Sequence, residues 1–308
     1  MNRYPNLACL ALALACSSKE APVAANPQPS ADLAVEIHSI AASLQGLMVN
    51  AHVIETTTGL VVVDSALTVS DAAALRARVD ALGKPLRAVL VTHGHPDHYN
   101  GVSALIADRD GVDVYATREV SQVIQRDDAA KEAQWRPVFG AEWPSARAFP
   151  NRELDDGATL DIDGLSFTVH ALGPGESDAD SYWVLEQPAP VAFVGDLVMH
   201  GVHAYVSDGH TRAWLDNLVA VRAELAGVER IYPGHGAAGG LELLDEQAAY
   251  LDAYRAAVER LRAGGSSLTQ AELDALAQEM KARFPDAPLE FLVELGAPAV
   301  AAELASEG

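Results

Sequence analysis

Short apolar runs alternate with amphipathic segments from about residue 32 onward, and this alternation predicts an α/β protein. Residues 165–170 switch between apolar and polar side chains at every position, as a half-buried strand does. The other predicted strands cover residues 48–55, 60–63, 88–91, 112–116, 159–162, 182–185 and 191–194.

Helices are predicted where apolar positions recur every three or four residues, or where a cap and a stop enclose a segment. Ser70 can cap a helix that runs to about residue 82, where Gly83 and Pro85 end it. An apolar stripe with spacings of four, three and four predicts another helix and assigns its members to the core: Trp214, Leu218, Val221 and Leu225.

The C-terminal part of the sequence is predicted to be helical throughout. One helix covers residues 243–262 and ends at Gly264 and Gly265, residues 269–272 form a capping box for the next, and Pro288 begins a last helix that runs to residue 303. These segments carry no candidate chemistry. We therefore expect residues 32–240 to form the main domain and residues 241–308 to be helices packed on it.

The first residues have the features of an export signal rather than of a folded domain. Arg3 supplies a positive charge, residues 7–15 an apolar stretch and residues 13–15 a small-residue cleavage region, so residues 1–15 are predicted to be a signal peptide. The apolar stretch is too short to span a bilayer as a helix. Residues 16–31, which contain three prolines, predict a flexible tether.

Both cysteines, Cys9 and Cys16, lie in this N-terminal segment, so a chain cleaved before Cys16 contains no internal disulfide. Residues 13–16, Ala-Leu-Ala-Cys, resemble a bacterial lipoprotein signal, although Ala13 departs from the leucine usual at that position. The resemblance implies that Cys16 carries a lipid and that the protein is an exported, periplasmic, membrane-anchored lipoprotein. An ordinary secretory signal is the alternative.

The charge balance narrows the class of partner. The formal net charge is -22, with 43 acidic residues against 21 lysines and arginines. Nucleic-acid binding needs clustered positive charge to neutralise phosphates, so it is a poor interpretation of this sequence. We expect a soluble surface and a small-molecule substrate, and the sequence leaves the oligomeric state open.

Three histidines and an aspartate occur within six residues, at His93, His95, Asp97 and His98, directly after the apolar run at 88–91. Neutral imidazole nitrogens and carboxylate oxygens are the ligands that a divalent transition metal such as zinc binds. In a tight loop, His93 and His95 can serve one metal while Asp97 and His98 serve a neighbouring one. The alternative is a histidine-rich surface loop, but the preceding strand and the spacing favour a metal site.

This segment resembles the His-x-His-x-Asp-His signature of the metallo-β-lactamase superfamily. Three further landmarks follow in the family's order: residues 61–64 (Val-Val-Val-Asp), 193–196 (Phe-Val-Gly-Asp) and 232–236 (Tyr-Pro-Gly-His-Gly). The resemblance implies that Asp64 buttresses the metal loop, that Asp196 bridges two metals and that His235 completes the second site. It covers about residues 35–240 and implies a four-layer αββα sandwich, here with extra C-terminal helices.

One position departs from the family pattern. The family usually has a third histidine for the first metal in a Pro-Gly-His sequence, whereas this chain has Pro174-Gly175-Glu176. A carboxylate also binds zinc, so a His-His-Glu set is chemically sound. Its extra negative charge favours harder ions such as manganese or iron. His170, at the end of a predicted strand, is the alternative ligand.

The resemblance implies two divalent metal ions, zinc before manganese or iron, that share a bridging hydroxide as the nucleophile. The expected metal ligands are His93, His95, Asp97, His98, Glu176, Asp196 and His235. Asp97 could also pass a proton to the leaving group, and His203 or Tyr205, which follow the bridging Asp196, could contact the substrate. The other histidines are assigned to surface loops (His200 and His210) or to strands (His38 and His52).

We therefore expect a dinuclear metal-dependent hydrolase that acts on an ester, lactone, thioester, amide, β-lactam or sulfate-type substrate. The third subclass of metallo-β-lactamases uses the same Asp-His pair without a cysteine, and alkyl sulfatases of the family carry Glu where Glu176 lies. Two alternatives remain. One is an iron-dependent oxidoreductase or sulfur-metabolising member of the same fold, although flavodiiron proteins have Glu where this chain has His95. The other is a non-catalytic metal-binding lipoprotein.

Overall fold

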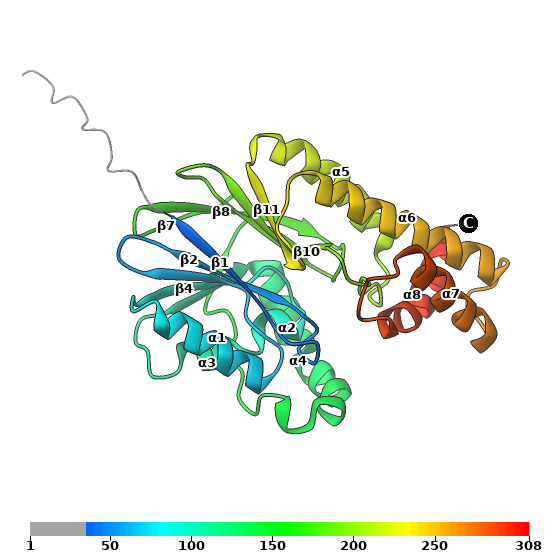
Figure 1. The fold of residues 1–308 in the computed structure, drawn as a ribbon, viewed down its shortest axis with the longest axis horizontal. Coiled ribbons are helices and arrows are strands. Elements are labelled where there is room, and N and C mark those ends of the chain that lie inside the picture. The colour runs from blue at the N-terminus through cyan, green and yellow to red at the C-terminus, as the bar shows by residue number, and fades with distance from the viewer. Residues whose placement is uncertain (1–34, 308) are drawn as a thin grey trace, which may run out of the picture. The chain divides into compact units, whose positions relative to one another are not determined.

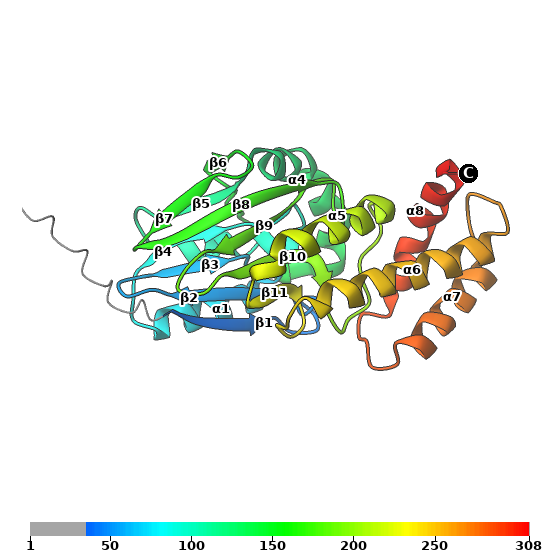
Figure 2. The same cartoon turned by 90° about the horizontal axis from the view of Figure 1, so that it is seen from above.

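Two β-sheets lie face to face between layers of helices in the computed structural model, which describes residues 35–307 (Figure 1 and Figure 2). The expected signal peptide (1–15) and tether (16–31) lie outside the described residues. In spatial order, the first sheet contains β1 (Glu36–Ala41), β2 (Asn50–Glu55), β3 (Leu60–Val63), β4 (Leu86–Leu90), β5 (Asp113–Thr117) and β6 (Arg152–Leu154). The second contains β11 (Arg230–His235), β10 (Val191–Met199), β9 (Asp180–Leu185), β8 (Leu165–Gly173) and β7 (Thr159–Ile162).

The two faces of the first sheet belong to different cores. Val61 of β3 packs between the sheets with Phe167 of β8 and Trp183 of β9. Its neighbour Val62 points to the opposite face of the sheet and packs with Leu75, a buried residue of helix α1 (Val69–Ala81). Because successive side chains of a strand point to opposite faces, a continuous apolar strand supplies both cores. The helices on this side are α1 (Val69–Ala81), α2 (Pro96–Tyr99), α3 (Val102–Ile106) and α4 (Arg118–Phe139), followed by a 3₁₀ turn at Gly140–Glu142.

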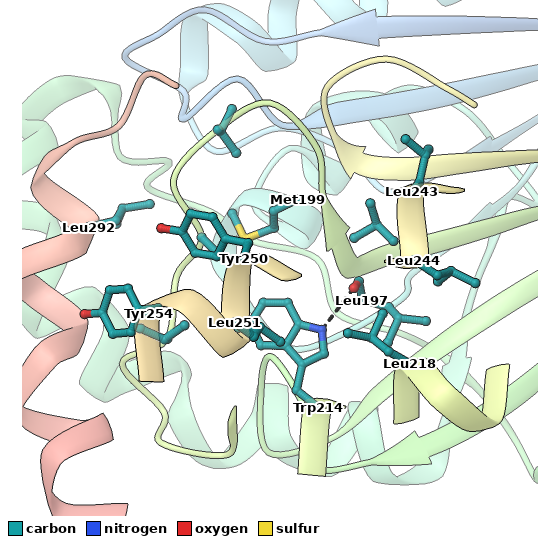
Figure 3. Packing of buried hydrophobic residues seen from close by; sticks show 14 of the residues in the cluster. Leu197, Met199, Trp214, Leu218, Leu243, Leu244, Tyr250, Leu251, Tyr254 and Leu292 are labelled. Carbon is teal, nitrogen blue, oxygen red and sulfur yellow. Dashed lines mark hydrogen bonds between the residues drawn. The ribbon is translucent and has the colours of Figure 1, made fainter. Parts of the chain in front are cut away.

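The second sheet is covered by helices from the C-terminal half of the chain. They are α5 (Thr211–Glu224), a 3₁₀ turn at Leu225–Gly227, α6 (Glu242–Arg262), α7 (Gln270–Arg283) and α8 (Phe291–Glu307). Figure 3 shows Trp214 of α5 at the centre of this packing, where its indole N–H donates to the carbonyl of Leu197 over 2.9 Å. Tyr250 of α6 and Leu292 of α8 belong to the same cluster, so the C-terminal helices share one core with the second sheet. No helix within residues 35–307 is long and apolar enough to cross a membrane.

The predicted αββα sandwich is confirmed, and the differences are local. Thr68, not Ser70, caps α1, because its side chain accepts from the backbone N–H of Asp71. The last helix begins at Phe291 rather than at Pro288. Of the half-exposed strand β1 the sequence-based prediction named only His38, and the 22-residue helix α4 has no counterpart in it.

Hydrogen bonds to backbone carbonyls join the two sheets at one edge. The N–H of Ser181, in β9, donates to the carbonyl of Thr92, just after β4, over 3.0 Å. The side-chain amide of Asn50, in β2, donates to the carbonyls of Pro233 and Gly236 over 3.0 and 2.7 Å. These contacts bring the ends of β4, β9 and β11 together, although they come from distant parts of the sequence.

Candidate metal centre

Seven buried side chains that can bind metal meet at this edge in two adjacent groups. The first ligand group consists of His93, His95 and Glu176, and the second of Asp97, His98, Asp196 and His235. They come from the loop and short helix after β4, the loop between β8 and β9, β10 itself and the end of β11. The structure therefore brings together all seven residues that the sequence predicts as ligands.

The potential ligand atoms of the first group are close. Glu176 Oε2 lies 2.8 Å from His95 Nδ1 and 3.4 Å from His93 Nε2. An oxygen of Asp196 lies 4.0 Å from His93 Nε2, so this carboxylate borders both groups. Asp196 is thus placed where a carboxylate could be shared by two cations.

The second group surrounds the same carboxylate. His98 Nε2 and His235 Nε2 each lie 3.3 Å from an oxygen of Asp196. Asp97 Oδ2 lies 3.6 Å from His98 Nε2 and 3.5 Å from His235 Nε2. Two imidazoles and two carboxylates therefore face one small volume.

Many of these atoms have no hydrogen-bond partner within the described chain, which is unusual for buried polar groups. They are His93 Nε2, His98 Nε2, His235 Nε2, both carboxylate oxygens of Glu176 and Asp196 Oδ1. Leaving such atoms unpaired costs free energy unless another species satisfies them. Because the unpaired atoms converge and are nitrogen and oxygen donors, the residues present fit divalent cations.

Three of the four imidazoles, those of His95, His98 and His235, are oriented through the far nitrogen. His98 Nδ1 donates to Asp64 Oδ2 over 2.8 Å, and His235 Nδ1 donates to the carbonyl of Leu47 over 2.9 Å. His95 Nε2 donates to Asp208 Oδ2 over 3.1 Å. A proton fixed on the far nitrogen leaves the lone pair of the near nitrogen directed at the centre.

Asp64 holds the loop as well as an imidazole. Its carboxylate also accepts from the N–H and the hydroxyl of Thr92 over 2.9 and 2.8 Å. The residue is 1% exposed and has a φ of 61°, in the left-handed region that Asp tolerates better than most residues. Leu47, whose carbonyl orients His235, also has a positive φ of 62°. The strained backbone at both positions aims the groups behind the imidazoles.

The Glu176 loop is fixed by a second buried carboxylate. Asp180 Oδ2 accepts from the N–H of Glu176 over 2.6 Å, and Asp180 Oδ1 accepts from the hydroxyl of Ser177 over 2.6 Å. A Cβ atom at Gly175 would lie 2.6 Å from Asp180 Oδ2, so a larger residue there would displace the carboxylate that fixes the loop.

Neighbouring carboxylates favour the charged form of the two imidazoles in the second ligand group. Burial lowers the pKa of His235, but the carboxylates of Asp196 and Asp97 outweigh burial and raise it to about 10. Burial also lowers the pKa of His98, which the carboxylates of Asp196, Asp64 and Asp97 raise well above its usual value. Bound cations would take over the charge that protons otherwise supply.

Three other residues were candidates for a metal ligand or for substrate contact, and the structure places them differently. His170 lies on β8 stacked on Tyr182, with ring centroids 4.7 Å apart, and is not part of either ligand group. His203 is buried, its Nδ1 lies 3.1 Å from the hydroxyl of Tyr250, and it does not line the pocket over the two groups. Tyr205 does line that pocket. The structure thus gives no support to substrate contact by His203.

The remaining histidines belong to neither ligand group, and His38 lies 3.8 Å from Glu36 and 3.3 Å from Glu55 in a separate, partly exposed group. His38 and His52 lie on β1 and β2, as predicted. The side chains of His200 and His210 are 33% and 31% exposed and lie near the carboxylates of Glu246 and Asp178.

Two charged residues near the centre were not identified from the sequence. Asp208 accepts from His95 Nε2 and also accepts from the Tyr205 hydroxyl over 3.2 Å. Lys131 of α4 lies 3.9 Å from Asp208 and 5.6 Å from the Tyr205 ring centroid. Each is a single charged residue in a segment without a recognisable motif. Their closeness to His95 and Tyr205 is therefore visible only in the folded structure.

An αββα sandwich with a two-part histidine and carboxylate centre at one edge defines a recognisable class of protein. A model of the metallo-beta-lactamase superfamily matches residues 44–235, more than half of the chain. The chain belongs to this superfamily.

Curated relatives resemble parts of the chain. A hydroxyacylglutathione hydrolase of Pseudomonas entomophila is 33% identical over 119 residues, which is 38% of this chain and 35% of that protein. A type 2 metallo-beta-lactamase of Bacteroides fragilis is 26% identical over 178 residues, which is 57% of this chain and 63% of that protein. The matched segments thus span less than two thirds of either relative.

Solved structures share the fold at low identity. A metallo-beta-lactamase family protein of Thermus thermophilus superposes with a TM-score of 0.61 at 21% identity, covering 89% of this chain and 93% of its own. A metallo-beta-lactamase of Pontibacter korlensis gives a TM-score of 0.54 at 20% identity, covering 73% of this chain and 97% of its own.

Proposed function

We propose that this protein is a hydrolase that works with two divalent cations, zinc before manganese or iron, one held by each ligand group. The observation that carries the proposal is the convergence of unpaired, buried nitrogen and oxygen atoms in the two groups. When bound, such cations supply a water-derived nucleophile at neutral pH and polarise the substrate's reacting oxygen. The named activities of the similar proteins, hydroxyacylglutathione hydrolase and metallo-beta-lactamase, are compatible with this chemistry.

The chain's own residues have separable tasks in this proposal. Asp196 lies next to the ligand atoms of both groups and would help to hold either cation. Asp97 faces His98 and His235 and also lines the pocket at 7% exposure. Its carboxylate could therefore accept a proton from the attacking water and pass that proton to the leaving group. The Tyr205 hydroxyl positions Asp208, and through it the far nitrogen of His95.

The test is to measure the metal content of the purified chain and then to screen ester, lactone, thioester, β-lactam, phosphate and sulfate substrates with and without a chelator. We expect two cations per chain and a hydrolytic activity that the chelator abolishes. A folded chain that binds no divalent metal contradicts the proposal, and iron with visible absorption would favour a redox member of the fold.

Glu176 provides the sharpest variant. Glu176→Ala is expected to lose the cation of the first ligand group, so that about one cation per chain remains, whereas Glu176→His restores a nitrogen donor and retains two. His170→Ala is the control and keeps two. If Glu176→Ala still binds two cations and His170→Ala binds one, the ligand assignment is wrong.

We also propose that the protein is exported and carries a lipid on Cys16. The proposal depends on the resemblance of residues 13–16 to a lipoprotein signal. Mass spectrometry of the membrane fraction tests it, since an unmodified N-terminus in the soluble fraction would indicate simple secretion.

A further inference from the structure

A cleft opens directly over the two ligand groups, and its walls are mostly apolar. His95, Asp97, Glu176, Asp196 and His235 form the polar end of the cleft. Apolar side chains line the rest: Trp135, Val138 and Phe139 from α4, Phe291 and Leu292 from α8, and Met199 from the end of β10. A molecule with its reacting group at the ligand groups would therefore extend between α4 and α8.

The cleft has little capacity for a charged substrate arm. Lys131 is the one lysine or arginine among the described side chains that line it. That ammonium already lies 3.9 Å from Asp208 and against the Tyr205 ring, and its side chain is only 15% exposed. An anionic arm would have to lose its hydration without a free cation to receive it, which is costly.

Two large apolar side chains stay exposed at the rim of the cleft. Val138 is 68% exposed and Phe291 is 51% exposed. Each belongs to a different helix, Val138 to α4 and Phe291 to α8. Apolar surface left open at a concave site gains free energy when an apolar group covers it.

One wall of the cleft lies outside the part of the chain that matches the family. The family match ends at residue 235, whereas Leu289, Phe291 and Leu292 belong to the C-terminal helical segment. Leu289 has a φ of 67°, a strained backbone for a branched side chain, and is 6% exposed. A strained residue held beside a site points to a functional constraint on this segment.

We propose that the substrate carries an apolar arm that lies between α4 and α8, and we test this arm as the acyl part of a carboxylic ester. This inference rests on the proposed hydrolase function and adds the class of substrate. Hydrolysis uses one water: the acyl carbon gains a bond to the water oxygen and loses its bond to the leaving oxygen, which takes a proton. The products are an apolar carboxylic acid and an alcohol.

The first experiment varies only the acyl arm. Methyl esters from acetate to octanoate share a small leaving group, and acid release is followed with a pH indicator on the zinc-loaded chain. Each methylene placed in an apolar site is expected to raise kcat/KM by up to about fourfold, so octanoate should exceed acetate by at least about tenfold. A flat or falling series with metal-dependent hydrolysis of methyl acetate overturns the inference but leaves the proposed function intact.

A matched pair of variants locates the arm. Val138 on α4 and Val219 on α5 are 68% and 73% exposed, and only Val138 lines the cleft. Val138→Ser is expected to lower the ratio of octanoate to acetate kcat/KM by about threefold, whereas Val219→Ser leaves it unchanged. An equal effect of both variants overturns the placement. So does a Val138→Ser chain that changes its mass by light scattering without changing the ratio, because the rim would then be an interface between chains.

A binding measurement does not depend on turnover. Octanoate and acetate are titrated calorimetrically into the zinc-loaded chain, and we expect octanoate to bind at least about tenfold more tightly. Equal affinities overturn the inference even if no ester is hydrolysed. A chain that holds no zinc instead contradicts the proposed function itself.

Discussion

Replacing Asp64 by asparagine isolates what one buried carboxylate contributes to the centre. The two side chains have the same shape, and Asn also tolerates the positive φ of 61° at this position. Asp64 accepts three hydrogen bonds, from the N–H and hydroxyl of Thr92 and from His98 Nδ1. An amide offers only one acceptor oxygen, so at least one of these donors loses its partner whichever way the amide is turned.

The expected loss falls mainly on metal affinity. If the amide N–H₂ faces His98, the proton leaves Nδ1 for Nε2, the nitrogen that lies 3.3 Å from Asp196 and faces the second ligand group. Partners behind metal-binding histidines are worth about 10- to 100-fold in affinity, or about 1.4–2.7 kcal/mol. Loss of hydrogen bonds to a charged acceptor also lowers the free energy of unfolding of the metal-free chain by about 1.5–3 kcal/mol per bond.

The assay is competition with a chromophoric chelator, which gives the affinity of each cation, together with urea unfolding of the metal-free chain. Asp163→Asn is the matched control, because Asp163 also has a positive φ, of 50°, and bonds Thr56 and Arg87 far from the centre. We expect that only Asp64→Asn lowers the binding affinity for one of the two cations, by at least about tenfold. If both variants bind zinc as the unchanged chain does, the reasoning about the far nitrogen of His98 is refuted.

Three further changes test other parts of the structure. Asp208→Asn removes the charged acceptor of the His95 Nε2 hydrogen bond. It is expected to lower the binding affinity for one cation about tenfold in the same competition assay. Gly234→Ala puts a Cβ 1.9 Å from an oxygen of Asp196, so it should abolish tight binding of at least one cation, whereas Gly227→Ala, with no atom within 4 Å of the added Cβ, should not. Burial lowers the pKa of His52 from 6.5 to about 4, so the unfolded chain binds more protons between these values and stability falls as pH drops through this window. The loss is at most about 3 kcal/mol, and His52→Gln should reduce the slope of unfolding free energy against pH in urea titrations.

The sequence predicts those parts of the molecule in which local chemistry and position coincide. Four potential metal ligands follow one buried strand within six residues: His93, His95, Asp97 and His98. This local pattern predicts a metal site without knowledge of the fold. Glu176 could be placed only as one of two candidates, because its approach to His95 depends on how the loop before β9 turns.

Helix α4 could not be predicted from its pattern of apolar residues. Its buried residues, Val120, Ser121 and Ile124, all lie in the first two turns. Farther along, the apolar side chains of Trp135 and Phe139 line the cleft rather than the core. A helix that packs at one end and borders a cleft at the other has no continuous apolar stripe, so it lacks the periodic signal that identified α5.

The two ligand groups draw on both halves of the sandwich. The loop after β4 belongs to the first sheet, while Asp196 and His235 belong to the second, and 137 residues separate His98 from His235 in the numbering. Cations held there would act as a cross-link that neither half can form alone, in the way a disulfide ties distant parts of a chain. A cation at 100 times its dissociation constant would add about 2.7 kcal/mol to the stability of the folded state. The free energy of unfolding of this protein would therefore increase with the fraction of chains that hold metal.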